Sequence, residues 1–258
     1  MEKRIFVDQM GRSVDVPISP KRIVSLVPSQ TELLHYFGLE NEVVGITKFC
    51  IHPDSWFKFK TRIGGTKQLK IDEIIALKPD LIIGNKEENT KHDIEKLEQN
   101  GLPVWMSDIN SFDEALEMIE QVGLICGKEM EATKLSTKIT HGFNEISSIG
   151  EGRSVLYFIW DEPSFVVGKN TFINSMIEKI GFINACDLSR YPNLSELPNP
   201  NPDLIFLSSE PFPFNEQHIE KYQKLFPNSK IILVDGEMIS WYGSRMLESV
   251  RYFVKLMN

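Results

Sequence analysis

Features that would assign the chain to a membrane, to nucleic acid or to a disulfide scaffold are missing from the sequence. No stretch approaches the roughly 20 apolar residues that a membrane-spanning helix needs. Lys and Arg number 28 against 36 Asp and Glu, and the net charge of −8 argues against a phosphate backbone as the main partner, so we expect no nucleic acid. The 3 cysteines, Cys50, Cys126 and Cys186, have no paired spacing, which excludes a disulfide framework and favours a reducing compartment.

Enzyme signatures are missing as well. The sequence has no Gly-x-Ser-x-Gly motif, no glycine-rich phosphate loop and no dinucleotide fingerprint after the first apolar strand, where residues 28–30 read Pro-Ser-Gln. Phosphate and dinucleotide sites use glycines that let the backbone approach the ligand. We therefore predict a protein that is not an enzyme, with no catalytic residues and no intrinsic cofactor.

The first residues carry a basic start but lack the apolar core, roughly 7–15 residues long, of a secretory signal. Either the protein stays inside the cell, or an export segment lies outside this sequence. The N-terminus alone does not decide between the two.

What the sequence does contain is an internal repeat. Glu73 stands six residues before Pro-Asp-Leu-Ile at 79–82, and Glu196 stands six residues before the same four residues at 202–205. Upstream of each copy, a basic residue enters an apolar strand and a helical pattern ends at glycine; downstream, another strand follows. Each half therefore reads strand, helix, strand, helix, strand, which is typical of an open α/β sheet.

The predicted fold is α/β, with two similar open-sheet lobes joined by a single long helix. A chain of 258 residues exceeds the usual size of one domain. We expect an N-terminal lobe over residues 1–127, an interlobe helix over 128–150 and a C-terminal lobe over 151–258.

The two ends of the chain carry elements of their own. Residues 5–16 alternate around Gly11 and predict an N-terminal hairpin. A last helix is predicted from about Gly243. Its inward face is expected to consist of Leu247, Val250, Val254 and Met257.

Several phrases, in their order, resemble those of a known family. They are the N-terminal hairpin, Pro-Lys-Arg-Ile-Val-Ser-Leu at 20–26, Thr-Glu-Leu-Leu at 31–34, Leu-Lys-Pro-Asp-Leu-Ile at 77–82, Val-Gly-Lys-Asn-Thr-Phe-Ile at 167–173 and Asn-Pro-Asp-Leu-Ile at 201–205. Together they look like the substrate-binding proteins of ABC importers for cobalamin, iron-siderophores and haem. The resemblance covers nearly the whole chain and is specific for the fold, not for the ligand.

The resemblance implies a metal chelate held in a cleft between the lobes and delivered to a membrane permease, with the ATPase of that permease as an indirect partner. It also implies a monomer in the periplasm or anchored outside the cytoplasmic membrane. The general rule for open α/β sheets points to the same place, because ligands bind outside the carboxyl ends of the strands. Here those ends are the loops at 28–30 and 160–162.

Acidic residues are expected to dock the permease. In the resembling family one carboxylate on each lobe pairs with permease arginines; the match in the second lobe is Glu196, and in the first it falls on Asp72 or Glu73. The alternative is that Asp72 and Ser195 are helix N-caps and that the glutamates merely favour the positive end of a helix.

Aromatic residues in the loops are expected to bind the ligand. Trp160, Trp241 and Tyr242 match positions that border the cleft in the resembling family, and aromatic faces suit a large planar ligand. Core packing is the alternative, and it is the role that we predict for Trp56 and Trp105.

Polar loop residues complete the expected site. Arg245 could reach a carboxylate, phosphate or amide of the ligand, with a surface salt bridge as the alternative. Ser29, Lys67 and Asn85 lie on loops that match ligand-facing loops of the first lobe.

Cys50 and His52 are potential metal ligands two residues apart. No second pair of ligands has a usual spacing, so we expect no metal site built from protein ligands alone. Either residue could approach the metal of a bound chelate, and His52 suits this better because imidazole is a common axial ligand in macrocycles.

The leading hypothesis is a non-enzymatic binding protein that captures a corrinoid, a haem or a ferric siderophore. The rival is a cytoplasmic protein or enzyme that handles metal chelates on the same scaffold, which the missing signal and the unpaired cysteines favour. A third hypothesis, an α/β enzyme for a small polar substrate, would need a charged catalytic pair formed by Asp161-Glu162 and Arg245.

Overall fold

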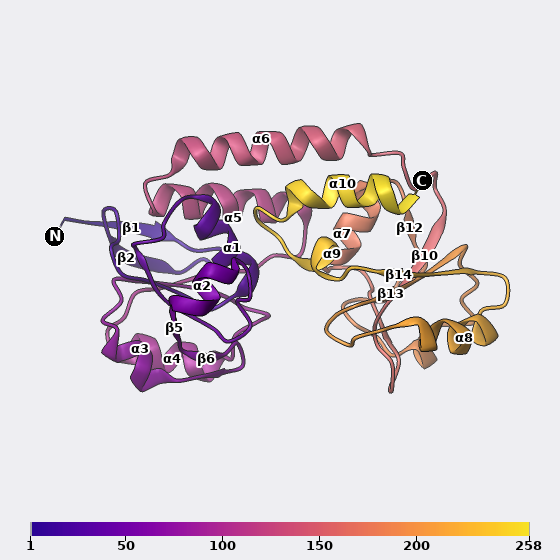
Figure 1. The fold of residues 1–258 in the computed structure, drawn as a ribbon, viewed down its shortest axis with the longest axis horizontal. Coiled ribbons are helices and arrows are strands. Elements are labelled where there is room, and N and C mark those ends of the chain that lie inside the picture. Colours follow the sequence, from indigo (N-terminus) through magenta and orange to yellow (C-terminus); the bar gives the residue numbers. More distant parts are fainter. Residues whose placement is uncertain (1, 258) are drawn as a thin grey trace. The chain divides into compact units, whose positions relative to one another are not determined.

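The computed structural model describes residues 2–257 and divides into two compact units. Unit 1 consists of Met1–Ile109, Glu114–Thr137 and Tyr242–Ser244, and unit 2 consists of Asn110–Asp113, Lys138–Trp241 and Arg245–Asn258. Each unit contains one open α/β sheet (Figure 1). Within the described residues, no helix is long and apolar enough to cross a membrane.

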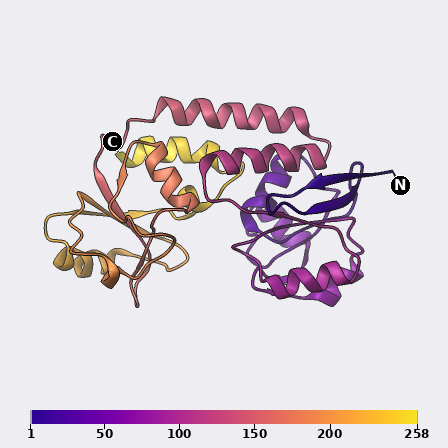
Figure 2. The ribbon, with the colours of Figure 1, turned by 180° about the vertical axis from the view of Figure 1, so that it is seen from behind.

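The sheet of unit 1 is parallel, with the strand order β5-β4-β3-β8-β9. Its strands are β3 (Ile23–Ser25), β4 (Val43–Ile46), β5 (Thr61–Arg62), β8 (Leu81–Asn85) and β9 (Val104–Ser107). Every residue of β8 is buried, as expected for a strand that is covered on both faces by helices. Figures 1 and 2 show α3 (Ile71–Ala76) and α4 (Lys91–Gln99) on one face and α5 (Phe112–Ile125) on the other.

Short elements complete unit 1. They are the hairpin of β1 (Lys3–Val7) and β2 (Ser13–Pro17), α1 (Pro28–Tyr36), α2 (Asp54–Phe59), and a second hairpin of β6 (Gly64–Gly65) and β7 (Gln68–Leu69). The N-terminal hairpin turns at Gly11, whose φ of +75° lies in the left-handed region. The predicted hairpin is therefore confirmed.

The sheet of unit 2 has the order β11-β10-β13-β14, with β12 paired to β10. Its strands are β10 (Ser154–Trp160), β11 (Phe165–Val166), β12 (Ile183–Asn184), β13 (Leu204–Ser208) and β14 (Lys230–Val234). Only β11 pairs antiparallel with its neighbour among these described strands. As in unit 1, the strand that carries Leu-Ile of the repeat, β13, is buried throughout.

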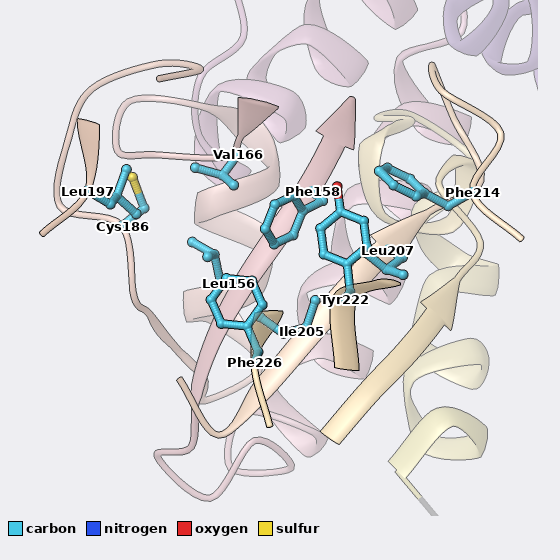
Figure 3. Close-up of a cluster of buried hydrophobic side chains, with 10 residues drawn as sticks. All are labelled: Leu156, Phe158, Val166, Cys186, Leu197, Ile205, Leu207, Phe214, Tyr222 and Phe226. Carbon is cyan, nitrogen blue, oxygen red and sulfur yellow. The ribbon is translucent and has the colours of Figure 1, made fainter. Parts of the chain in front are cut away.

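Helices cover both faces of this second sheet. In Figures 1 and 2, α8 (Glu216–Leu225) lies on one face, whereas α7 (Phe172–Lys179) and α10 (Met246–Met257) lie on the other. The two remaining helical segments are the 3₁₀ turn η1 (Leu194–Glu196) and α9 (Glu237–Ser240). Figure 3 shows the core beneath α8, where the ring of Tyr222 stands 4.6 Å from that of Phe158 on β10 in an edge-on contact.

The repeated Pro-Asp-Leu-Ile has the same structural task in both units. The carboxylate of Asp80 accepts hydrogen bonds from the N–H groups of Lys21 and Arg22, each at 2.8 Å, just before β3. The carboxylate of Asp203 accepts bonds from the N–H and the hydroxyl of Ser154 at the start of β10, each at 2.7 Å. In each unit, the repeat therefore ties the start of one central strand to the start of its parallel neighbour.

The helix α6 (Glu129–Glu145) is shorter than the predicted range 128–150. Its residues up to Thr137 belong to unit 1, and those from Lys138 on belong to unit 2. Turns follow it to Gly150, whose Cβ position would collide with the backbone of Gly181 at 2.5 Å. Only glycine, which has no Cβ, allows the two backbones to approach this closely just before β10.

Two predictions about helices were wrong. The helix α10 begins at Met246 and buries Met246, Ser249 and Phe253, whereas Val254 of the predicted inward face is exposed. Neither Asp72 nor Ser195 is an N-cap: α3 begins after Lys70, and the cap of η1 is Asn193.

Candidate functional site

The carboxyl edge of each sheet, where its parallel strands end, holds the loops predicted to bind a ligand. In unit 1 a polar network joins three of these ends. The Gln30 amide donates to the Ser107 hydroxyl at 2.7 Å, and the Asn85 amide donates to the same oxygen at 3.0 Å. Asn85 also accepts bonds from the N–H groups of Glu87 and Glu88. Because Asn85 is buried with its amide fully engaged, it shapes the edge from within.

Tyr242 packs into this network from a distant part of the chain. Burial raises the pKa of its hydroxyl, against the opposing influence of the nearby Ser29 and Ser107 side chains. The next residue, Gly243, has a φ of +97°, and its backbone approaches Leu33 and Ser29 of α1. Ser29 and Tyr242 therefore support the edge of unit 1 and are both buried.

The burial of Cys50 contradicts the expectation that its thiol contacts the metal of a bound chelate. The thiol is 0% exposed and lies 3.1 Å from each of the hydroxyls of Thr31 and Thr47. Burial raises the pKa of this thiol. A buried, protonated thiol is not available to the metal of a ligand outside the fold.

The accessible part of the edge in unit 1 differs from this buried set. His52 is half-buried in the loop after β4, and Phe49 in the same loop is half exposed. Lys67 is exposed and donates to the carbonyl oxygen of Glu87. Burial raises the pKa of the Glu88 carboxyl, although the charge of Lys67 opposes the shift.

In unit 2, an aromatic cluster stands at the ends of β10 and β13. Trp160, the last residue of β10, is 41% exposed, and its ring lies 5.7 Å from Phe212 in an edge-on contact. Phe212 in turn contacts Phe214 at 4.8 Å and His218 at 5.3 Å. The indole N–H of Trp160 donates to the carbonyl oxygen of Glu162 at 3.3 Å. The Trp160 ring is therefore partly exposed to solvent while its neighbours hold it in place.

A second aromatic group stands at the end of β14. The Trp241 indole N–H donates to Glu210 Oε1 at 2.9 Å, and the Ser240 hydroxyl donates to the same atom at 2.8 Å. The guanidinium of Arg245 lies 5.0 Å from the centre of the Trp241 ring and forms an ion pair with Glu237 at 3.3 Å. Trp241 is thereby held at its N–H and at its face.

Arg245 is 6% exposed and forms a salt bridge with the half-buried Glu237, so the alternative of a salt bridge is present, but below the surface. Burial raises the pKa of Glu210, and the nearby charge of Glu237 adds to the shift, against the hydrogen bonds from Ser240 and Trp241. Near the end of β14, the partly buried carboxyl group of Glu210 therefore contacts the same Trp241 as Arg245, whose charge is neutralised by Glu237.

Asp161, Glu162 and Arg245, which the enzyme hypothesis requires as a catalytic pair, each bond other residues. Lys221 of α8 bonds Asp161 and Glu162, each at 2.8 Å, and the Tyr222 hydroxyl donates to Asp161 at 2.9 Å. Burial acts to raise the pKa of Asp161, but these hydrogen bonds outweigh it and the pKa is lowered. Asp161 and Glu162 thus fix the loop after Trp160, while Arg245 pairs with Glu237.

The repeated acids lie at the carboxyl edge of their own sheets. The helix α3 runs back towards the start of β8, so its first turn, with exposed Asp72 and Glu73, faces that edge. Glu73 pairs with Lys70 at 2.8 Å. In unit 2, η1 is bonded to the loop after β10, and Glu196 accepts the N–H of Asn193 at 2.8 Å in a capping box.

Three residues at these edges were not predicted: Glu88, Glu210 and Phe212. The acids follow β8 and β13, the two strands of the repeat, by only a few residues, and that position was the available signal. The surroundings of Glu210 depend on its distant partners Ser240 and Trp241, which no local pattern reveals. Within residues 2–257, no group of three or more His, Cys, Asp or Glu could hold a metal ion.

Comparison with known proteins gives consistent results. The model of a family described as periplasmic binding protein matches residues 23–227. The ABC transporter substrate-binding lipoprotein YvrC of Bacillus subtilis, itself uncharacterized, is 27% identical, with 94% of this chain and 82% of that protein aligned. The vitamin B12-binding protein of Vibrio campbellii is 27% identical over 58% of this chain and 56% of its own length.

Solved structures share the fold. The petrobactin-binding protein YclQ of Bacillus subtilis superposes with a TM-score of 0.82 at 17% identity, covering 100% of this chain and 99% of that one. The vitamin B12-binding protein BtuF of Vibrio cholerae gives a TM-score of 0.77 at 20% identity, covering 93% and 98%. At these identities, the likeness establishes the architecture of two α/β lobes and leaves the ligand open.

Proposed function

Because the chain belongs to the periplasmic binding protein family, we propose that it is the substrate-binding component of an ABC importer and that its ligand is a metal chelate. The relatives named above bind vitamin B12 or petrobactin, and a further structural neighbour of Pseudomonas aeruginosa binds haem. The ligand class is therefore a corrinoid, a haem or a ferric siderophore. The protein binds this ligand and carries out no chemical step on it.

The aromatic surface at the carboxyl edge of unit 2 supports this proposal most directly. Trp160 is exposed yet held by Phe212 and by its own N–H bond, so little side-chain freedom is lost when a planar ligand stacks on it. Trp241 offers a second indole, fixed by Glu210 and Arg245.

The remaining predicted residues divide into two roles. His52 and Lys67 lie at the accessible edge of unit 1 and contact the ligand, His52 as a potential axial ligand of its metal. Arg245 acts by positioning Trp241. Ser29, Asn85 and Tyr242 hold the loops in place from inside unit 1.

The exposed acids of α3 and η1 form the proposed docking points for the permease. In unit 1, Asp72 makes no hydrogen bond or ion pair among residues 2–257, whereas Glu73 is paired with Lys70. Among residues 2–257 neither Asp72 nor Glu196 forms an ion pair, so both keep their full charge for arginines of a partner, and we assign docking to these two residues. The importer would place the protein outside the cytoplasmic membrane, as the lipoprotein relative suggests.

Tryptophan fluorescence tests ligand binding. Titration with cyanocobalamin, haemin and a ferric siderophore should quench emission for at least one chelate with a dissociation constant well below 1 mM. Trp160→Ala should weaken that binding by about tenfold or more, since a large stacked ring is lost.

Tyr36→Ala is the matched control. This exposed aromatic residue ends α1, at the opposite edge of the unit 1 sheet, and its loss should leave the affinity unchanged. No binding to any of the chelates would refute the proposed function. An unchanged affinity in Trp160→Ala would remove that residue from the site.

A further inference from the structure

In each unit, a partly buried glutamate follows the strand of the repeat, at the edge of the sheet where the parallel strands end. Glu88 follows β8 in unit 1, and Glu210 follows β13 in unit 2. Burial is the main cause that raises the pKa of each of these two carboxyl groups. Such groups are costly to keep charged unless they meet a donor or a cation.

The environment of Glu210 leaves one acceptor atom open. Both donors, the Trp241 indole N–H and the Ser240 hydroxyl, bond Oε1. Within residues 2–257, Oε2 makes no hydrogen bond, and it is not sealed from solvent. Asp235 and Glu237 lie close enough for their charges to raise the pKa of Glu210 further. This surface therefore attracts donors and positive charge.

The cations Arg245 and Lys221 at the edge of unit 2 are paired with other acids and do not neutralise Glu210. Arg245 is 6% exposed and paired with Glu237 at 3.3 Å. Lys221 is shared between Asp161 and Glu162 at 2.8 Å each. An incoming carboxylate or catecholate would have to displace one of these acids to find a cation, and would meet Glu210 at the same time.

Unit 1 repeats the pattern. Among the residues that the structure describes, the Glu88 carboxylate makes no hydrogen bond or ion pair. Lys67, whose charge opposes the raised pKa of Glu88, donates its hydrogen bond to the carbonyl oxygen of Glu87. Lys86, on the other side, pairs with Asp108.

We infer that the carboxyl edge of unit 2 selects the ligand by charge: Glu210 accepts hydrogen bonds from an uncharged or cationic chelate whose periphery carries N–H donors such as carboxamides, and it discriminates against chelates with free carboxylates or catecholates. Glu88 is the corresponding acceptor at the edge of unit 1. The inference rests on the proposed function and narrows its ligand class. Corrinoids bearing peripheral amides meet the requirement; haem with free propionates and tris-catecholate iron complexes do not.

Matched ligands test the inference on the unmodified protein. Calorimetry would compare cyanocobalamin with its monocarboxylate, in which one side-chain amide is hydrolysed, and haemin with its dimethyl ester. For the ring that binds, the uncharged member should bind about tenfold tighter or more. Equal or tighter binding of the carboxylate member would overturn the inference and leave the proposed function standing. No binding of any of these members would also overturn the inference, and the proposed function falls with it when the ferric siderophore does not bind either.

A protein variant then assigns the effect to Glu210. In Glu210→Gln the amide oxygen can still accept from Trp241 and Ser240, so the fold and the indole position are kept. The preference for the uncharged ligand should shrink by about fivefold or more, because the like charge is gone. The control Glu220→Gln, on exposed α8 surface of the same unit, should leave the preference unchanged. A preference as large in Glu210→Gln as in the unmodified protein would exclude Glu210 as the selecting group.

Discussion

At the residue scale, carboxylates of similar sequence context differ in their surroundings and in their effect. Asp80 and Asp203 stand at the starts of strands and accept backbone N–H bonds, so they are structural. Glu88 and Glu210 stand beyond the ends of the same strands and keep open acceptor capacity, so they are suited to a ligand. The repeat thus places a structural acid at one end of the strand and a functional acid at the other.

Asp203 makes stability depend on pH. Hydrogen bonds from the N–H and hydroxyl of Ser154 hold the pKa of this carboxyl below its usual range. Because the folded pKa is depressed, the stabilisation is present above the unfolded pKa, near ~3.9, and is lost as pH falls through the folded value.

Urea denaturation of the unmodified protein and of Asp203→Asn over this range provides the measurement. The difference in unfolding free energy between the two should be constant near neutrality and should shrink in acid. A difference that grows as the pH falls would contradict this account of Asp203.

At the element scale, the sequence predicted the regular elements better than the sites. Apolar runs such as Leu81–Asn85 and the glycine after α1 are local signals, and the strands and helix ends that they predict were confirmed. In α10, Val254 was wrongly predicted to face inward and Phe253 was missed, because Val254 is as apolar as the partly buried Leu247 and Val250. Which apolar stripe is buried depends on the sheet beneath, and that is not a local property.

The accessibility of two candidate site residues was predicted wrongly for the same reason. Cys50 lies in a loop and Asn85 ends β8, and both positions look accessible in the sequence. Thr31, Thr47 and Ser107 from other segments nevertheless enclose them. Trp56 and Trp105 were correctly predicted as core residues, since both are buried.

The N-terminal hairpin offers a test of how one element is anchored. The fully buried carboxylate of Asp8 accepts bonds from the Arg12 guanidinium at 2.7 and 2.8 Å and from the Met106 N–H of β9. Arg12→Ala leaves this buried charge without its counterion and should lower the unfolding free energy by about 3 kcal/mol.

Chemical denaturation measures that loss. Arg4→Ala removes an exposed cation from the same hairpin and should cost much less. Equal losses in the two variants would contradict the role of the Asp8 pair as the anchor.

At the scale of the whole molecule, duplication explains both the fold and the placement of the acids. Two units with the same central strands, β3-β8-β9 and β10-β13-β14, each carry an exposed acid ahead of the repeated strand. Family membership follows from the match over residues 23–227, which the order of the sequence phrases predicted. The identity of the chelate depends on side chains that meet only in the folded units, so the phrases do not contain it.

Docking is tested by charge reversal on both units at once. Asp72→Lys combined with Glu196→Lys should reduce transport by about tenfold or more in cells that carry the cognate permease, because two attractive contacts become repulsive. The affinity for the chelate should stay unchanged. Glu73→Lys combined with Glu196→Lys, as the comparison, should have the smaller effect; the reverse order would assign docking to Glu73.

The metal content of the protein after exposure to chelates tests the central claim most directly. The protein is incubated separately with cyanocobalamin, haemin, a ferric siderophore and the free Co²⁺ and Fe³⁺ ions, passed through a gel-filtration column, and analysed for cobalt and iron. We predict retention of about one metal per chain for at least one chelate and none for the free ions, since residues 2–257 offer no cluster of protein ligands. Retention of the free ions, or of no chelate at all, would contradict the account.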